Sequence, residues 1–154
     1  MKKLNYLFVI AAVFMISCGG SDQASNESTE APKSMVAEEK PVDPMENKGI
    51  GPISSVVLAS EIDTEMVGRG QVLYDAMCTA CHKPDVNYIG PAPKGIMSRR
   101  SPEWIMNMIL DPEKMVKEDP VAKELLKRYL APMANQSLTE DEARKILEYF
   151  RTLE

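Results

Sequence analysis

The stretch Cys78-Thr79-Ala80-Cys81-His82 places two thiols three residues apart and a histidine directly after the second thiol. On one turn of helix, each thiol can form a thioether to a haem vinyl group, and the histidine then lies beneath the iron. The motif therefore predicts one covalently attached haem c, bound through Cys78 and Cys81, with His82 as an axial ligand of the iron.

Two other chemistries use paired cysteines at this spacing, and both fit the sequence poorly. A thioredoxin-type thiol pair follows a strand in a βαβ unit, whereas a helical pattern precedes Cys78. A structural zinc site needs four ligands, and His82 is the only histidine of the chain. The remaining cysteine, Cys18, lies far away in sequence, so haem attachment remains the favoured chemistry.

Outward from the motif, apolar residues recur at helical spacing in four segments, and no segment alternates with period two. The first covers residues 66–77, and the second begins after Ser101, a good N-cap followed by Pro102. The third covers about 119–130, and the last begins after Thr139 with acidic residues in its first turn. We predict an all-α bundle of about four short helices, whose thin core is completed by the haem.

The N-terminus has the pattern of an export signal. Two lysines precede a nearly unbroken apolar run over residues 4–16, which is too short to span a bilayer comfortably. The junction Ser17-Cys18 resembles the lipobox of bacterial lipoproteins, in which cleavage leaves a lipid-modified cysteine as the first residue. We predict a lipoprotein signal peptide over residues 1–17 and lipid attachment at Cys18. The alternative is an ordinary secretory signal with an unrelated cysteine nearby.

The following stretch differs in composition from a folded domain. Residues 19–48 hold no aromatic side chain and carry seven acidic against three basic side chains. Such a segment cannot bury enough apolar surface to offset its ordering entropy. We predict a disordered acidic tether over residues 18–48, with a root-mean-square span of about 30 Å. The apolar residues 49–60 end it, which assigns the haem domain to residues 49–154.

Charge and cysteine usage narrow the function classes further. The chain has 18 Lys and Arg against 23 Asp and Glu, a formal net charge of -5, and removal of residues 1–17 would leave -7. An acidic mature protein argues against binding to nucleic acid and against electrostatic docking on anionic lipid. If Cys18 carries lipid and Cys78 and Cys81 carry haem, all three cysteines of the chain have a role and none is left for a disulfide.

Residues 66–154 resemble a class I c-type cytochrome, the small soluble electron-carrier family. Gly70 lies eight residues before Cys78, and Tyr74 lies four before it, as in that family. The resemblance implies that Gly70 lets the first helix cross closely over the last one. Tyr149 would be the matching aromatic residue on that last helix.

The resemblance extends to the loop after the haem motif. It implies that a backbone carbonyl of Gly90-Pro91 accepts the hydrogen bond from Nδ1 of the ligand histidine, which would fix the ring orientation. Pro91 is thereby expected among the residues that bind the cofactor. Lys83 departs from the family pattern, in which glycine is frequent directly after the histidine, but this leaves the ligand assignment of His82 unchanged.

The residues alone leave the sixth ligand of the iron open. A second histidine is excluded within one chain, and methionine is the next candidate. A ligand facing His82 must come from a distant, irregular segment, and Met97, Met115 and Met133 all lie in expected loops. Pro132 stiffens the segment of Met133, and the family places its methionine in such a loop before the final helix. The resemblance therefore implies Met133, with Met97 as the second candidate.

Three side chains after the Gly-Pro loop are candidates for binding the haem propionates. Arg99, Arg100 and Trp104 all carry N–H donors that suit a carboxylate, and we predict Arg99 and Trp104 as the residues that bind the cofactor. The alternatives are a solvated pair formed by Arg99 and Arg100, and a tryptophan that only packs in the core.

The chemistry of the site predicts function. An iron held by His82 and Met133 has no vacant position for substrate, and it changes charge with little rearrangement. Small apolar residues around Met133 suit a brief contact with redox partners. We therefore predict a monomeric, lipid-anchored electron carrier and not an enzyme. It would be exported to the periplasmic side of a bacterial membrane or cell envelope, and would serve respiratory complexes, terminal oxidases or reductases.

Two alternatives remain open at this point. In a haem-based gas sensor or a haem enzyme, Met133 would dissociate easily and expose the iron to small ligands. In a larger oxidoreductase, the domain would be a fixed subunit through which electrons enter. The long tether favours movement between partners over fixed docking.

Overall fold

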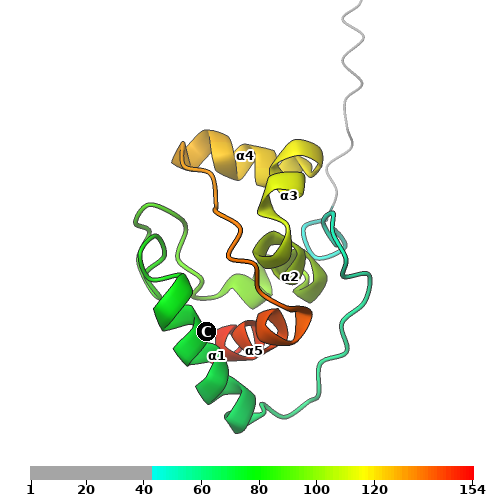
Figure 1. The fold of residues 1–154 in the computed structure, drawn as a ribbon. Coiled ribbons are helices and arrows are strands. Elements are labelled where there is room, and N and C mark those ends of the chain that lie inside the picture. The colour runs from blue at the N-terminus through cyan, green and yellow to red at the C-terminus, as the bar shows by residue number, and fades with distance from the viewer. Residues whose placement is uncertain (1–42) are drawn as a thin grey trace, which may run out of the picture. The chain divides into compact units, whose positions relative to one another are not determined.

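The computed structural model describes residues 43–154. In this range the chain forms five α-helices and one short 3₁₀ turn, with no strand, which confirms the predicted all-α fold. The elements, shown in Figure 1, are α1 (Thr64–Met77), η1 (Ile96–Ser98), α2 (Pro102–Leu110), α3 (Pro112–Glu118), α4 (Pro120–Tyr129) and α5 (Glu140–Phe150). No helix in this part of the chain is long and apolar enough to cross a bilayer. The predicted signal peptide, Cys18 and most of the predicted tether lie outside the described residues.

The helices begin where the sequence places N-capping residues. Ser101 Oγ accepts a hydrogen bond from the backbone N–H of Trp104 at 3.1 Å, so α2 begins as predicted. At the start of α5, Thr139 and Glu142 form a reciprocal capping box. These bonds satisfy backbone N–H groups that would otherwise lack partners at the helix start.

The structure contains one helix more than predicted. The seven-residue α3 begins after Asp111, whose side chain accepts from the backbone N–H of Lys114 at 3.1 Å. It is too short to display a repeating apolar stripe, so periodicity did not reveal it. Met115, expected in a loop, lies on this helix and is fully buried.

The crossing of α1 over α5 forms the centre of the domain. A Cβ atom at Gly70 would overlap the backbone carbonyl group of Lys145, so only glycine permits this approach. The ring of Tyr74 packs 5.4 Å from that of Tyr149, centroid to centroid, and edge-on to Phe150 at 5.7 Å. This is the close crossing that the family resemblance implied, and it fixes the end of α1, where the haem motif begins.

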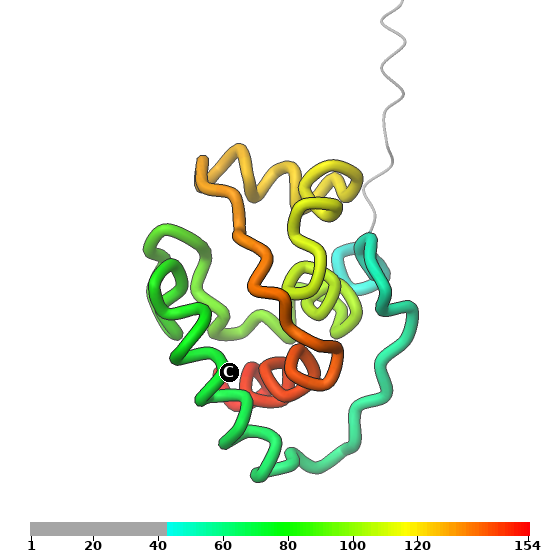
Figure 2. Tube along the Cα trace, viewed as in Figure 1, coloured from blue at the N-terminus to red at the C-terminus, as the bar shows by residue number. Residues whose placement is uncertain are grey.

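Residues 47–63, here called the strap, run ahead of α1 along the outside of the domain (Figure 2). Asn107 on α2 holds the strap by its side chain. Its Nδ2 donates to the carbonyls of Lys48 and Ile53, and its Oδ1 accepts from the N–H of Ile53, each at 2.9 Å. The side chain of Asn107 therefore bonds the strap to α2 from Lys48 onward, next to residue 49, at which the haem domain is predicted to begin.

A buried carboxylate, that of Glu148, holds the C-terminal end of the strap against α5. Glu148 on α5 accepts hydrogen bonds at 2.6 Å from both Arg144 and Arg151, and at 3.0 Å from the backbone N–H of Asp63. Arg151 also donates to the carbonyl of Ala59 at 2.8 Å. The charge of Glu148 is thus paired and hydrogen-bonded, as burial of a carboxylate requires.

We expect Glu148 to make the stability of the domain depend on pH. Burial alone would raise the pKa of Glu148, but the hydrogen bonds from Arg144 and Asp63 and the two arginine charges outweigh it, so the pKa lies below its usual value. The resulting stabilisation is complete above the unfolded-state pKa of about 4.3 and is lost as the pH falls through the lower folded-state value. At pH 6 we expect Glu148→Gln to unfold at a lower temperature than the parent protein. Between pH 6 and pH 3 its unfolding temperature should fall less steeply than that of the parent. Parallel pH profiles for the two proteins would contradict this.

Candidate functional site

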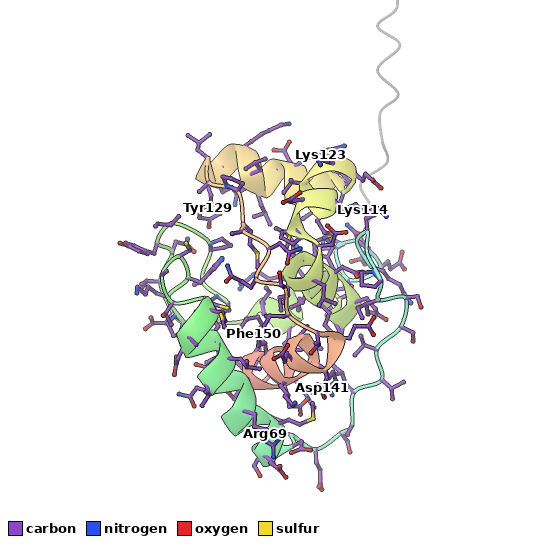
Figure 3. The ribbon with its side chains drawn as sticks, in the orientation of Figure 1. Arg69, Lys114, Lys123, Tyr129, Asp141 and Phe150 are labelled. Atoms are coloured by element: carbon purple, nitrogen blue, oxygen red, sulfur yellow. The ribbon has the colours of Figure 1, made fainter. Side chains whose placement is uncertain are left out.

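A cavity of about 250 Å³ opens between the helices and the two long loops. Apolar side chains make up most of its walls, contributed by every α-helix. Tyr129 at the end of α4 and Phe150 at the end of α5 are two of them, and both are labelled in Figure 3. Arg99 and Arg100 are the only Lys, Arg, Asp or Glu side chains of the described residues that line it.

The predicted attachment residues meet at this cavity. Cys78 and Cys81 are unpaired and line the cavity together with His82. The three residues form one tight turn, in which the backbone N–H groups of Cys81 and His82 both donate to the carbonyl of Cys78, at 3.0 and 2.8 Å. Two free thiols and an imidazole on an apolar cavity are the donors that haem c requires, so the residues fit this group.

The electrostatics of Cys78 argue against thiol redox chemistry. Burial, helped by the neighbouring Cys81, raises the pKa of Cys78 to about 11. Reactive redox thiols have a lowered pKa instead, because the thiolate is the nucleophile. Among the described residues, no group of three or more His, Cys, Asp or Glu is placed to hold a metal ion.

The histidine is fixed in orientation from three sides. Its Nδ1–H donates to the carbonyl of Pro91 at 2.8 Å, which is the contact that the resemblance implied. Its own carbonyl accepts from the hydroxyl of Tyr74 at 2.9 Å, and a Cβ at Gly90 would overlap the imidazole ring. Since a carbonyl only accepts, the proton lies on Nδ1, and Nε2 of His82 keeps its lone pair for a metal ion.

The methionines divide clearly by position. Those that line the cavity are Met77, Met108 and Met133. Met77 directly precedes Cys78 and Met108 lies on α2, whereas Met133 lies in the irregular segment 130–139 that leads from α4 to α5 (Figure 1). Met97 packs against the core without lining the cavity. Met115 is buried elsewhere, with its sulfur 3.0 Å from the N–H of Ile50.

Local backbone geometry directs the segment 130–139 across the cavity. Leu130 ends α4 in the left-handed conformation with φ of 55°, which turns the chain out of the helix. Asn135 then holds the segment in place, because its Nδ2 donates to the carbonyl of Leu110 at 3.2 Å and its Oδ1 accepts from Ser137 at 2.7 Å. Met133 lies between these two fixed points.

The indole N–H of Trp104 has a partner outside the cavity lining. Its single indole N–H donates to the buried carboxylate of Asp119 at 3.1 Å. Because indole has only this one donor, the N–H of Trp104 is already engaged and is not directed at a haem propionate in this structure. The residue instead contributes its ring to the cavity wall. Sequence reasoning missed Asp119, which had been considered only as the start of α4.

The two arginines differ in their surroundings. Arg99 is exposed, and its guanidinium donates to the carbonyls of Lys94 at 2.8 Å and Ala92 at 3.1 Å. Arg100 is half-buried and lies over the ring of Trp104, 5.3 Å from its centroid. Burial, followed by the charge of Arg99, lowers the pKa of Arg100. Both line the cavity, whereas only Arg99 was predicted to bind the cofactor.

Comparison with known proteins places these features in one family. The family model for cytochrome c matches residues 67–154, and no curated protein matches the chain. A cytochrome c from Rhodothermus marinus is 41% identical, with 67% of this chain and 89% of that chain covered and a TM-score of 0.66. An engineered form of it is 40% identical, with 67% and 90% covered and a TM-score of 0.65.

A more distant structure supports the fold alone. The cytochrome c domain of a Pseudomonas putida protein is 24% identical, with 54% of this chain and 85% of that chain covered and a TM-score of 0.50. The family model, by contrast, covers more than half of this chain, including Cys78, Cys81 and His82. The chain therefore belongs to the cytochrome c family, as a class I c-type cytochrome with covalently bound haem c.

Proposed function

We propose that this protein is a membrane-tethered monohaem cytochrome c that carries single electrons between respiratory redox partners. The family assignment already makes it a haem c electron carrier. The observation that carries the proposal is the presence of Cys78, Cys81, His82 and Met133 around one apolar cavity. When bound there, haem c supplies a reversible one-electron couple.

In this proposal each residue has a separate task. Cys78 and Cys81 hold the haem covalently, and Nε2 of His82 binds the iron in an orientation set by the carbonyl of Pro91. The thioether of Met133, which lines the same cavity, would be the second protein ligand of the iron and would leave no position for a substrate. Arg99 and Arg100 supply the positive charge that the haem propionates need.

The surroundings of Met133 suit transient contact with other redox proteins. Ala131, Pro132 and Ala134 line the cavity next to the methionine and are small. Ile89 also lines the cavity and is 43% exposed. A small apolar margin of this kind favours brief contacts of low area, which allow fast dissociation after each electron transfer.

We expect the ferrous protein to bind carbon monoxide slowly or hardly at all at neutral pH, because Met133 occupies the sixth position. Stopped-flow mixing with carbon monoxide measures this directly, and Met133→Ala should bind the gas much faster. Rapid, stoichiometric binding to the well-folded parent protein would instead favour a gas sensor or haem enzyme.

The membrane tether is the second part of the proposal. It is supported by the short apolar run 4–16, the Ser17-Cys18 junction and the acidic composition of residues 19–48. Several acyl chains on one cysteine bind a membrane stably, where a single chain binds only marginally. The strap, into which the tether leads, contributes no residue to the cavity lining. Attachment there would leave the cavity accessible, while the tether raises the local concentration of the domain near membrane complexes.

Replacement of Cys18 by Ser should separate membrane attachment from haem chemistry. We expect Cys18→Ser to leave haem attachment and the visible spectrum intact, but to release the domain or leave it as an unprocessed precursor. Fractionation and mass spectrometry check this, with Ser21→Ala as a control that remains in the membrane fraction. A freely soluble parent protein that begins, unmodified, downstream of Cys18 would contradict the tether.

A further inference from the structure

Asp119 is a buried carboxylate between α3 and α4 on which three parts of the chain meet. Its Oδ1 accepts from the indole N–H of Trp104 at 3.1 Å and from the backbone N–H of Ala122 at 2.7 Å. Its Oδ2 accepts from Nδ2 of Asn47 at 2.7 Å. The side chain is only 1% exposed. One carboxylate therefore joins α2, the start of α4 and the strap.

Two of the three hydrogen-bond partners of Asp119 line the haem cavity. The ring of Trp104 lines the cavity, and so does Ala122 at the start of α4. Further along α4, Leu125 and Tyr129 line it as well, and the helix leads into the segment that holds Met133. The position of Asp119 therefore determines where two walls of the cavity lie.

The third partner fixes the strap against the back of the same wall. Asn47 accepts from the N–H of Gly49 with its Oδ1 at 2.8 Å and from Ser101 Oγ with its carbonyl at 2.6 Å. Gly49 has φ of 69°, and a Cβ there would lie 2.8 Å from Met115 and 3.2 Å from Trp104. The strap is thus seated directly on the tryptophan, although it lies before the matched residues 67–154.

The charge of Asp119 has no direct counter-ion among the described residues. Its three hydrogen-bond donors are all neutral, and no Lys or Arg lies within ion-pair distance of it. Arg100 lies over the ring of Trp104, and the charge of Asp119 acts on its guanidinium group from beyond ion-pair distance. A buried negative charge beside the cavity favours the ferric over the ferrous state, because the oxidised group carries one more positive charge.

We propose that Asp119 is a positioning residue of the haem pocket, which couples the seating of the strap to the reduction potential of the haem. It acts through Trp104 and α4, and Asn47 is the contact through which the strap takes part. The inference concerns the folded domain alone, so it stands whether or not Cys18 carries lipid.

The experiment compares four variants of the full-length holoprotein. The first two are Asn47→Ala, which removes the strap contact but keeps the charge, and Asp119→Asn, which removes the charge. The third is the double exchange Asn47→Asp with Asp119→Asn, in which the amide introduced at the N-cap of α4 donates to the carboxylate introduced on the strap and still accepts from Trp104. Asp111→Asn is the matched control, because Asp111 caps α3 as Asp119 caps α4, whereas the indole N–H of Trp104 donates to Asp119 and not to Asp111.

Two measurements report on the proposal. Potentiometric titration gives the midpoint potential. Because Trp104 is the only tryptophan, the NMR spectrum of the ferrous protein contains one indole N–H signal, whose shift and exchange protection report on its hydrogen bond. Thermal unfolding, measured alongside, separates simple loss of stability from both effects.

We expect Asp119→Asn to raise the midpoint potential and to shift the indole signal. Asn47→Ala should shift both in smaller amount, and the exchange variant should restore the indole signal while bringing the potential part of the way back. Asp111→Asn should change neither. The proposal is wrong if Asn47→Ala keeps both the parent potential and the parent indole signal, if the exchange variant does not show the parent indole signal, or if Asp111→Asn shifts the potential as far as Asp119→Asn. Should Asp119→Asn fail to fold, the other two variants still decide the question.

Discussion

Met133→Ala should abolish the weak far-red absorption that arises from a thioether bound to ferric iron. It should also lower the reduction potential by on the order of 100 mV, a fraction of the roughly 0.8 V over which axial ligands set haem potentials. The reason is that the soft sulfur stabilises the ferrous state, whereas water or hydroxide in its place favours the ferric state. Visible and near-infrared spectra with potentiometric titration measure both effects.

Met97→Ala provides the matched control for this variant. It removes the same side chain from a residue that packs against the core but does not line the cavity. We expect it to keep the far-red band and nearly the parent potential. If Met97→Ala loses the band while Met133→Ala keeps it, the assignment of the axial ligand is wrong.

Gly70→Ala should destabilise the domain by about 3 kcal/mol or more, the upper part of the range for overpacked cores. The added methyl group overlaps the carbonyl group of Lys145, which is helix backbone and cannot move aside as a flexible side chain would. To accommodate it, α1 must shift away from α5, which also moves Tyr74 off Tyr149. Because Cys78 follows at the end of α1, we expect a lower yield of haem attachment as well.

Gly68→Ala is the control, because Gly68 lies on the same helix and nothing approaches the position of its Cβ within 4 Å. There the same substitution should stabilise the domain by about 0.5 to 1 kcal/mol, since alanine loses less backbone entropy in a helix. Chemical denaturation of the two holoproteins measures the contrast. Equal stabilities for Gly70→Ala and Gly68→Ala would show that the helix crossing tolerates a side chain.

The sequence predicts those parts of the fold that rest on local chemistry. Ser101 and Thr139 mark helix starts because a capping side chain bonds to N–H groups two or three residues away. The haem motif is local as well, because the N–H groups of Cys81 and His82 bond to the carbonyl of Cys78 and hold the thiols and the histidine on one turn. The close crossing of α1 over α5 could be predicted only because Gly70 and Tyr74 stand at the same distances from Cys78 as in the cytochrome c family.

The features that sequence reasoning missed depend on contacts between distant residues. The hydrogen bond from Trp104 to Asp119 spans 15 positions and is invisible to any helical period. Seating of the strap depends on single side chains, such as Asn107, that bond to backbone 54 to 59 positions away. The helix α3 escaped notice because seven residues provide only one fully buried apolar position, Met115, besides Pro112.

A potentiometric titration of the purified holoprotein, followed by its visible spectrum, tests the central claim most directly. We expect one reversible transition with the slope of a one-electron couple, a low-spin spectrum in both states, and a far-red thioether band in the ferric state. A high-spin ferric spectrum without that band would contradict axial ligation by His82 and Met133. A transition that is not reversible would contradict the role of an electron carrier.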